Sequence, residues 1–169
     1  MTFGFLSDIK RAVGLERKMG DLLGWQNTRW GMTGDEIVRA VGADVVKRSE
    51  RQRYHGAYSV LCIPNVSIGS HSFKVMFQMD EASERLSQVL VSYEDLELSD
   101  PRGVFEVARC VLTERFDKPE RVSTAEIWQW TFETTYIELS MTYLPGVLSG
   151  VCIRFFPADG QNSYFVAAF

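Results

Sequence analysis

The strongest structural signal in this sequence is the stretch WGMTGDEI, which covers residues 30–37. Thr33 followed three residues later by Glu36 is the pattern of a capping box, in which the hydroxyl accepts a backbone N–H and the carboxylate reaches back to the cap residue. Met32 before the cap and Ile37 after it fit a hydrophobic staple across the first turn. The stretch therefore predicts that a helix begins directly after Thr33.

The residues that follow fit a short helix and then a charged segment. Ile37, Val38 and Val41 recur at the spacing of one helix face, so we expect all three to be buried. Gly42 is expected to end the helix, because glycine adopts the backbone conformation of a C-terminal cap at little cost. Residues 47–54 carry many charges and no apolar alternation. We interpret them as a solvated helix extension or a loop.

A second helix is predicted from residue 100 onward. Asp100 is expected to cap it, and Pro101 is tolerated at the first helical position. Pro119 follows the expected end of this helix. Its predicted buried face consists of Val104, Ala108, Val111, Leu112 and Arg115, with Phe105 and Phe116 beside it.

Alternation of apolar and polar residues predicts about six strands. Their expected ranges are 58–63, 73–79, 86–93, 126–132, 135–143 and 151–156. The number of residues between the caps Thr33 and Asp100 is about the same as the number between corresponding strands of the two halves of the chain. This equal spacing indicates an internal repeat or a chance match of common elements. We expect an α+β fold: an antiparallel sheet of two helix-strand-strand-strand halves, 30–98 and 99–157, with both helices packed on one face.

Two terminal segments flank this core. Residues 1–29 are predicted to form a helical segment, with residues 30–169 as a single α+β domain. The apolar side of the first residues is expected to pack on the domain or on a partner chain, with weak contact to a membrane surface as the alternative. The uncharged tail 163–169, SYFVAAF, either pairs within the domain or builds a homo-oligomer interface, because an exposed apolar edge promotes association.

The composition fits one globular domain. The chain has 169 residues, of which 46% are hydrophobic and 24% are charged, so wholesale disorder is excluded. A net charge of −4 disfavours a general nucleic-acid binder. No apolar run approaches the roughly 18 residues of a membrane span, and the first residues lack the pattern of a secretory signal. We expect a cytoplasmic protein.

The three cysteines are Cys62, Cys110 and Cys152. An odd number without a CxxC pair argues against a disulfide scaffold, a zinc site and a thioredoxin-like redox motif. Each cysteine falls in an apolar strand or helix pattern. All three are therefore expected to be buried free thiols, which pack as small hydrophobic groups.

The stretch at residues 30–37 resembles the opening of many small, mostly uncharacterised bacterial proteins. That opening has the pattern W/F-G-M-S/T-x-x-E-V/I, where x is any residue. In that group a strand meander, a second helix, a strand with tryptophan and a T-x-I-x-L strand follow. Trp128 or Trp130 and the segment 135–139, TYIEL, match the last two features. The helix start is also similar to that of the small lipoprotein of the bacterial outer-membrane assembly machinery. This chain lacks the lipidated cysteine of that family, so a lipoprotein role does not carry over.

No recognised catalytic motif is present in the sequence. The two histidines, His55 and His71, fall in predicted loops and belong to no metal-ligand pattern such as HExxH. A pairing of Cys62 with His71 across adjacent strands would be the one nucleophilic arrangement, but packing explains both residues better. The sequence therefore favours a non-enzymatic role, with no cofactor and no metal.

Two groups of residues are candidate binding residues. Arg51 and Arg53 form the one basic cluster, with Tyr54 and Tyr58 nearby, and this cluster is a solvated face or a contact for an acidic protein or nucleic acid. Trp128 and Trp130 share one strand face because side chains alternate with a period of two. They are core residues, or they line an aromatic groove for a partner or an apolar ligand.

These observations lead to two hypotheses of function. The first is a protein-interaction module of a bacterial cytoplasm with a protein partner rather than nucleic acid, a class that includes small acidic proteins that neutralise a toxin. The second is a ligand-binding protein or an enzyme with an unfamiliar site between the sheet and the helices. A filled interior would favour the first, and a polar pocket the second.

Overall fold

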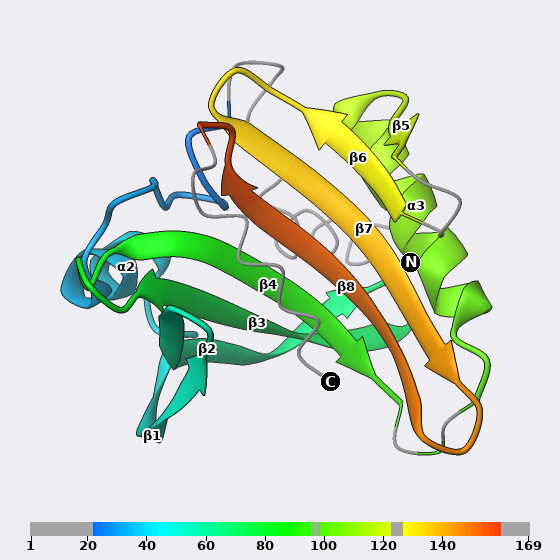
Figure 1. Cartoon of the computed structure of the whole chain (residues 1–169), viewed down its shortest axis with the longest axis horizontal. Coiled ribbons are helices and arrows are strands. Elements are labelled where there is room, and N and C mark those ends of the chain that lie inside the picture. The colour runs from blue at the N-terminus through cyan, green and yellow to red at the C-terminus, as the bar shows by residue number, and fades with distance from the viewer. Residues whose placement is uncertain (1–21, 96, 98, 123–126, 160–169) are drawn as a thin grey trace, which may run out of the picture.

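The computed structural model describes residues 22–95, 97, 99–122 and 127–159. These residues form one antiparallel sheet of eight strands with two helices (Figure 1). The elements are α2 (Gly34–Val41), β1 (Val46–Tyr54), β2 (Ala57–Ile68), β3 (His71–Asp80), β4 (Leu86–Glu94), α3 (Arg102–Phe116), β5 (Glu120–Arg121), β6 (Ile127–Thr131), β7 (Thr135–Leu144) and β8 (Leu148–Pro157).

The strands lie in the order β1-β2-β3-β4-β8-β7-β6-β5, so β4 and β8 pair at the centre of the sheet. The predictions of about six strands and of three strands after each helix are wrong, because four strands follow each helix. The additional strands are β1 and β5. The internal repeat itself stays a prediction.

The two additional strands lack the alternation of apolar and polar residues that predicts a strand from sequence. Most side chains of β1 are exposed, so residues 47–54 show no alternation and were misinterpreted as a helix extension or loop. β5 has only two residues. The predicted end of β2 at Ile63 is also wrong, since the strand continues through Pro64 to Ile68. An irregular register between Ile63 and Val66 accommodates the proline, which cannot donate to a strand ladder.

Helix α2 begins as predicted. The backbone N–H of Thr33 donates to Glu36 Oε2 at 2.8 Å, and the N–H of Glu36 donates to the Thr33 hydroxyl at 3.4 Å. Ile37 is fully buried, and Gly42 ends the helix with a φ of 94°. The expectation that Val38 and Val41 are buried is wrong: Val38 is 41% exposed and Val41 is only partly buried, because this helix of two turns presents a single narrow stripe to the sheet.

Replacing Thr33 with alanine is expected to lower the free energy of unfolding by about 1 kcal/mol at neutral pH. Hydrogen bonds from Thr33 hold the pKa of Glu36 below its ordinary value of 4.5. A lowered folded-state pKa adds stability above the unfolded-state pKa, and this stability is lost as the pH falls through the folded-state pKa. The penalty in urea unfolding should therefore shrink below pH 4.5. Thr33→Ser is the matched control because it keeps the hydroxyl, and equal losses for Thr33→Ser and Thr33→Ala would contradict the capping box.

Residues 30–33 also tie α2 to the sheet. The indole N–H of Trp30 donates to the Thr135 hydroxyl on β7 at 2.9 Å. The N–H of Gly31 donates to the carbonyl of Leu86, whose own N–H donates to the carbonyl of Met32. The stretch before the cap therefore fixes the helix start against the first residue of β4.

Helix α3 begins one residue later than predicted. Pro101 occupies the cap position with a φ of −82° and a ψ of 7°, and it provides no side-chain hydrogen bond. Asp100 was expected at the cap, and its carboxylate instead accepts from the backbone N–H of Arg102 at 3.1 Å. Val111 and Arg115 are only partly buried. The residues of α3 that are buried are Val104, Phe105, Ala108 and Leu112.

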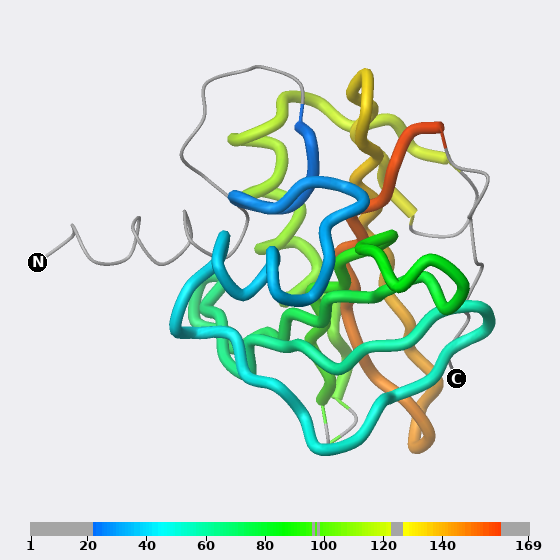
Figure 2. The backbone as a smooth tube through the Cα atoms, turned by 90° about the vertical axis from the view of Figure 1, so that its left-hand side faces the viewer, coloured from blue at the N-terminus to red at the C-terminus, as the bar shows by residue number. Residues whose placement is uncertain are grey.

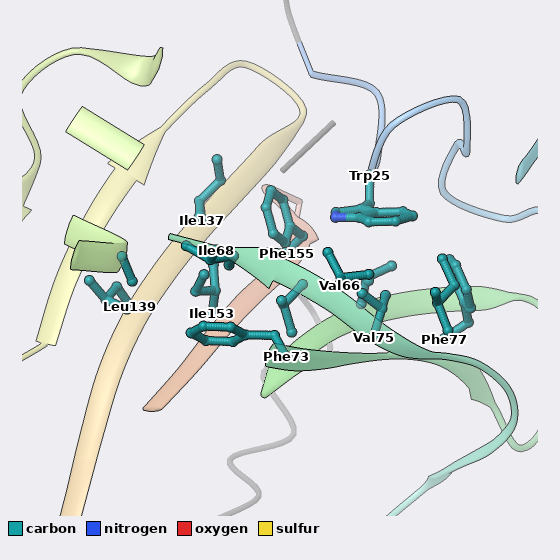
Figure 3. Packing of buried hydrophobic residues seen from close by; sticks show 14 of the residues in the cluster. Trp25, Val66, Ile68, Phe73, Val75, Phe77, Ile137, Leu139, Ile153 and Phe155 are labelled. Atoms are coloured by element: carbon teal, nitrogen blue, oxygen red, sulfur yellow. The ribbon is translucent and has the colours of Figure 1, made fainter. Parts of the chain in front are cut away.

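The core lies on one face of the sheet (Figure 3). One apolar row runs across six paired strands, with every side chain at most 3% exposed: Leu61, Phe77, Val89, Phe155, Ile137 and Trp130. Trp25, from the loop before α2, packs edge-on against Phe77 with the ring centroids 5.6 Å apart. This loop therefore closes the core over β3.

The two helices lie near opposite ends of the curved sheet, α2 beside β1–β3 and α3 beside β5–β7 (Figures 1 and 2). They do not lie side by side, and the Trp25 loop packs on the core as well. The predicted single layer of helices over one face is therefore wrong. The described part of the chain contains no helix that is both long and apolar enough to span a membrane.

Several predictions concern residues that the structure does not describe. The helical segment over residues 1–21 and the tail 163–169 lie outside the described residues. Residues 22–33 form turns and irregular structure rather than helix. The roles expected of the two terminal segments in packing, membrane contact or oligomerisation stay predictions.

Candidate partner-binding surface

The structure brings four of the six candidate binding residues together on the β1–β2 hairpin (Figure 1). Tyr54 pairs with Ala57, so His55 and Gly56 form a two-residue turn. Gly56 has a φ of 75°, a conformation that glycine adopts at little cost because it has no Cβ. The turn holds Arg51 and Arg53 close to Tyr58 on the neighbouring strand.

Arg51 and Arg53 both contact the β3–β4 turn. The Arg51 guanidinium lies 4.3 Å from the centre of the Tyr58 ring and forms an ion pair of 3.4 Å with Glu84. Arg53 forms an ion pair with Glu81. All four charged side chains are substantially exposed, so these pairs add little stability. Their main effect is to neutralise the basic cluster and to hold its side chains in place.

The two tyrosines of the hairpin have different surroundings. Tyr58 is only 6% exposed and belongs to the core cluster. The Tyr54 hydroxyl donates to Met76 Sδ at 3.6 Å. Burial raises the pKa of Tyr54, and a contact with Gln78 partly opposes this effect. Burial raises the pKa of Tyr58 as well, so both phenols stay protonated at neutral pH. The arginines and their carboxylate partners belong to the exposed surface of the hairpin, together with most other side chains of β1.

The two candidate tryptophans lie on β6, away from the hairpin. Trp130 is 2% exposed, and its indole N–H donates to the carbonyl of Asp117 at 2.7 Å. It is a core residue. Trp128 is partly buried, with the Arg109 guanidinium 5.4 Å from its ring centre. The tryptophans therefore do not join the arginine and tyrosine residues in one site.

The thiols and histidines are dispersed. Burial raises the pKa of Cys152 to about 12, so this thiol is protonated at neutral pH and is a poor nucleophile. Of the three thiols expected to be buried, Cys62 is buried and Cys152 is only partly buried, whereas Cys110 is exposed because it lies on the outer side of α3. The expectation that His71 lies in a loop is wrong, because His71 is the first residue of β3, where it packs edge-on against Tyr93. Within the described residues, no three His, Cys, Asp or Glu side chains are grouped so that they could hold a metal ion.

Sequence reasoning missed two features of the surface. Leu144 and Val147, in the turn between β7 and β8, are 50% and 73% exposed. Arg154 and Glu138 form an ion pair on the sheet face opposite the core, with side chains only 14% and 15% exposed. The proline and glycine at residues 145–146 predicted the turn, but alternation gave no indication of its exposure or of the ion pair.

Comparison with known proteins found no match to any family, curated protein or solved structure. The resemblance of residues 30–37 to the bacterial helix opening therefore stays a prediction.

Proposed function

We propose that this protein is a non-enzymatic protein-interaction module, and that the exposed side of the β1–β2 hairpin with the β3–β4 turn is its contact surface. The observation that carries the proposal is the fixed position of Arg51, which contacts both the Tyr58 ring and the Glu84 carboxylate. Arg53, beside it on β1, forms an ion pair with Glu81.

Side chains held in this way suit partner recognition. Arginine and tyrosine are enriched among the residues that dominate binding energy at protein interfaces. Ordering a long side chain costs free energy on association, and a side chain that is already held loses less. The hairpin surface therefore offers a partner a preformed array of guanidinium and carboxylate groups.

The contact is made by side chains rather than by addition of a strand to β1. The register of β1 with β2 is irregular between Lys47 and Gln52. Irregular pairing and charged side chains are devices that protect a sheet edge from pairing with another chain. At the other end of the sheet, β5 is too short to accept a strand of useful length.

A protein fits this surface better than nucleic acid does. Binding to a phosphate backbone depends on cations that neutralise phosphates, whereas Glu84 and Glu81 already pair with Arg51 and Arg53. The net charge of −4 acts in the same direction. A bacterial cytoplasmic protein that neutralises a toxin is one member of the proposed class.

The test is affinity capture from extract of the cell of origin, with the full chain as bait. The variant Arg51→Ala/Arg53→Ala should lose the captured protein or bind it about tenfold more weakly. Arg102→Ala is the matched control, because Arg102 is also an exposed arginine in an ion pair. Equal capture by the wild type and the double variant would overturn the assignment of this surface. A metabolite that stabilises the fold while no protein is captured would favour the ligand-binding alternative.

A further inference from the structure

The turn between β7 and β8 carries two strongly exposed apolar side chains. Leu144 is 50% exposed and Val147 is 73% exposed. Residues 145 and 146, which separate them, are exposed as well. Single exposed apolar residues are common, but two at the tip of one hairpin form a compact apolar knob. We call these two residues the apolar tip.

The apolar tip is held in one conformation. Leu144 pairs with Leu148 in the register of β7 and β8, and the N–H of Val147 donates to the carbonyl of Leu144 at 2.9 Å. Gly146 has a φ of 72°, which a residue with a side chain rarely adopts. A partner would therefore meet a preformed surface and would not have to order a loop.

Carboxylates at the end of β4 and just after it lie on one side of the base of the apolar tip. The N–H of Asp95 donates to the carbonyl of Ser149 at 3.1 Å, and Glu94 pairs with Gly150. The Asp95 carboxylate accepts hydrogen bonds from Ser99 and from the N–H of Glu97. Glu94 and Glu97 are exposed. The apolar tip thus has an acidic border on its β4 side.

We propose that the apolar tip is a second contact surface, which inserts into an apolar pocket bordered by lysine or arginine on a partner protein. Charge complementarity selects this occupant, because basic residues around the pocket would face Glu94, Asp95 and Glu97. The same carboxylates oppose an anionic lipid surface. Contact between the tips of two copies would bring two acidic borders together. The apolar tip and the β1–β2 hairpin lie at opposite ends of the view in Figure 1, so the two proposals stand separately.

A photo-crosslinking amino acid tests the proposal. The full chain with p-benzoylphenylalanine in place of Val147 is produced in the cell of origin, illuminated, and its adducts are sequenced. We expect an adduct with one protein, attached in an apolar segment that is flanked by lysine or arginine. Val122, also exposed at 54%, is the matched control position and should not give this adduct. An adduct with lipid or with a second copy, a polar or acidic attachment site, or no adduct would overturn the proposal.

A binding measurement then separates contact from folding. With the crosslinked partner purified, Val147→Asp should weaken its binding about tenfold or more, whereas Val122→Asp should leave it unchanged. Added salt should weaken the binding of the wild type. Val147→Asp should keep the thermal midpoint of the wild type, because the side chain is exposed. Unchanged affinity of Val147→Asp would overturn the proposal, and Arg51→Ala/Arg53→Ala reports on the β1–β2 hairpin independently.

Discussion

Replacing Trp25 with alanine is expected to lower the free energy of unfolding by about 3–5 kcal/mol. Trp25 is fully buried and packs edge-on against Phe77, which lies in the central row of the core. The backbone N–H of Trp25 donates to the Thr28 hydroxyl, which in turn donates to the Trp25 backbone carbonyl. Truncation would therefore leave a cavity over β3 that the short loop cannot fill by collapsing. The loss is measured by urea unfolding monitored by far-UV circular dichroism.

Trp128→Ala provides the matched control for this prediction. It removes the same side chain from a partly buried position on β6, so the loss should be clearly smaller than for Trp25. Trp25→Phe should recover part of the stability because the ring contact with Phe77 is partly kept. Equal losses for Trp25→Ala and Trp128→Ala would show that the Trp25 loop does not close the core.

Local sequence signals predicted the elements that depend on interactions between residues close in sequence. The capping box at Thr33 and Glu36 involves residues three positions apart, so the sequence contains the whole device. The alternation in β7 predicted a strand because one of its faces is buried and the other is partly exposed. In contrast, β1 is a strand because β2 pairs with it, and its own side chains carry no signal of that pairing.

The candidate site shows the same difference between contacts that are local in sequence and contacts that only the fold creates. Arg51, Arg53, Tyr54 and Tyr58 are close in sequence, so their proximity was predictable. Their carboxylate partners come from the β3–β4 turn, which only the register of four strands, β1 to β4, brings near. The cluster was therefore expected to be basic, although the fold neutralises much of its charge. Trp130 is a core residue for a similar reason, because it belongs to the row of buried side chains that runs across the sheet to Leu61.

The sheet face opposite the core contains a polar pair that a sequence pattern would place in solvent. Glu138 and Arg154 are directly paired residues on β7 and β8. The Nε and Nη2 groups of Arg154 both donate to Glu138 Oε1, at 3.1 Å and 2.6 Å. The Arg154 guanidinium also lies 5.4 Å from the centre of the Phe156 ring. Most of both side chains is shielded from water, so each charge is stabilised by the opposite charge of the other side chain.

Glu138→Leu is expected to lower the free energy of unfolding by about 3–5 kcal/mol, because it leaves the largely buried guanidinium of Arg154 without this carboxylate. Glu138→Gln keeps an acceptor and should cost less. The double variant Glu138→Leu/Arg154→Met should recover most of the loss, since an apolar pair of similar volume replaces a buried ion pair at little cost. Urea unfolding of the wild type, Glu138→Leu, Arg154→Met and the double variant gives the coupling energy directly. Additive losses in the double variant would show that each charge is solvated on its own, and that packing of the aliphatic stems, rather than the ion pair, stabilises this part of the sheet.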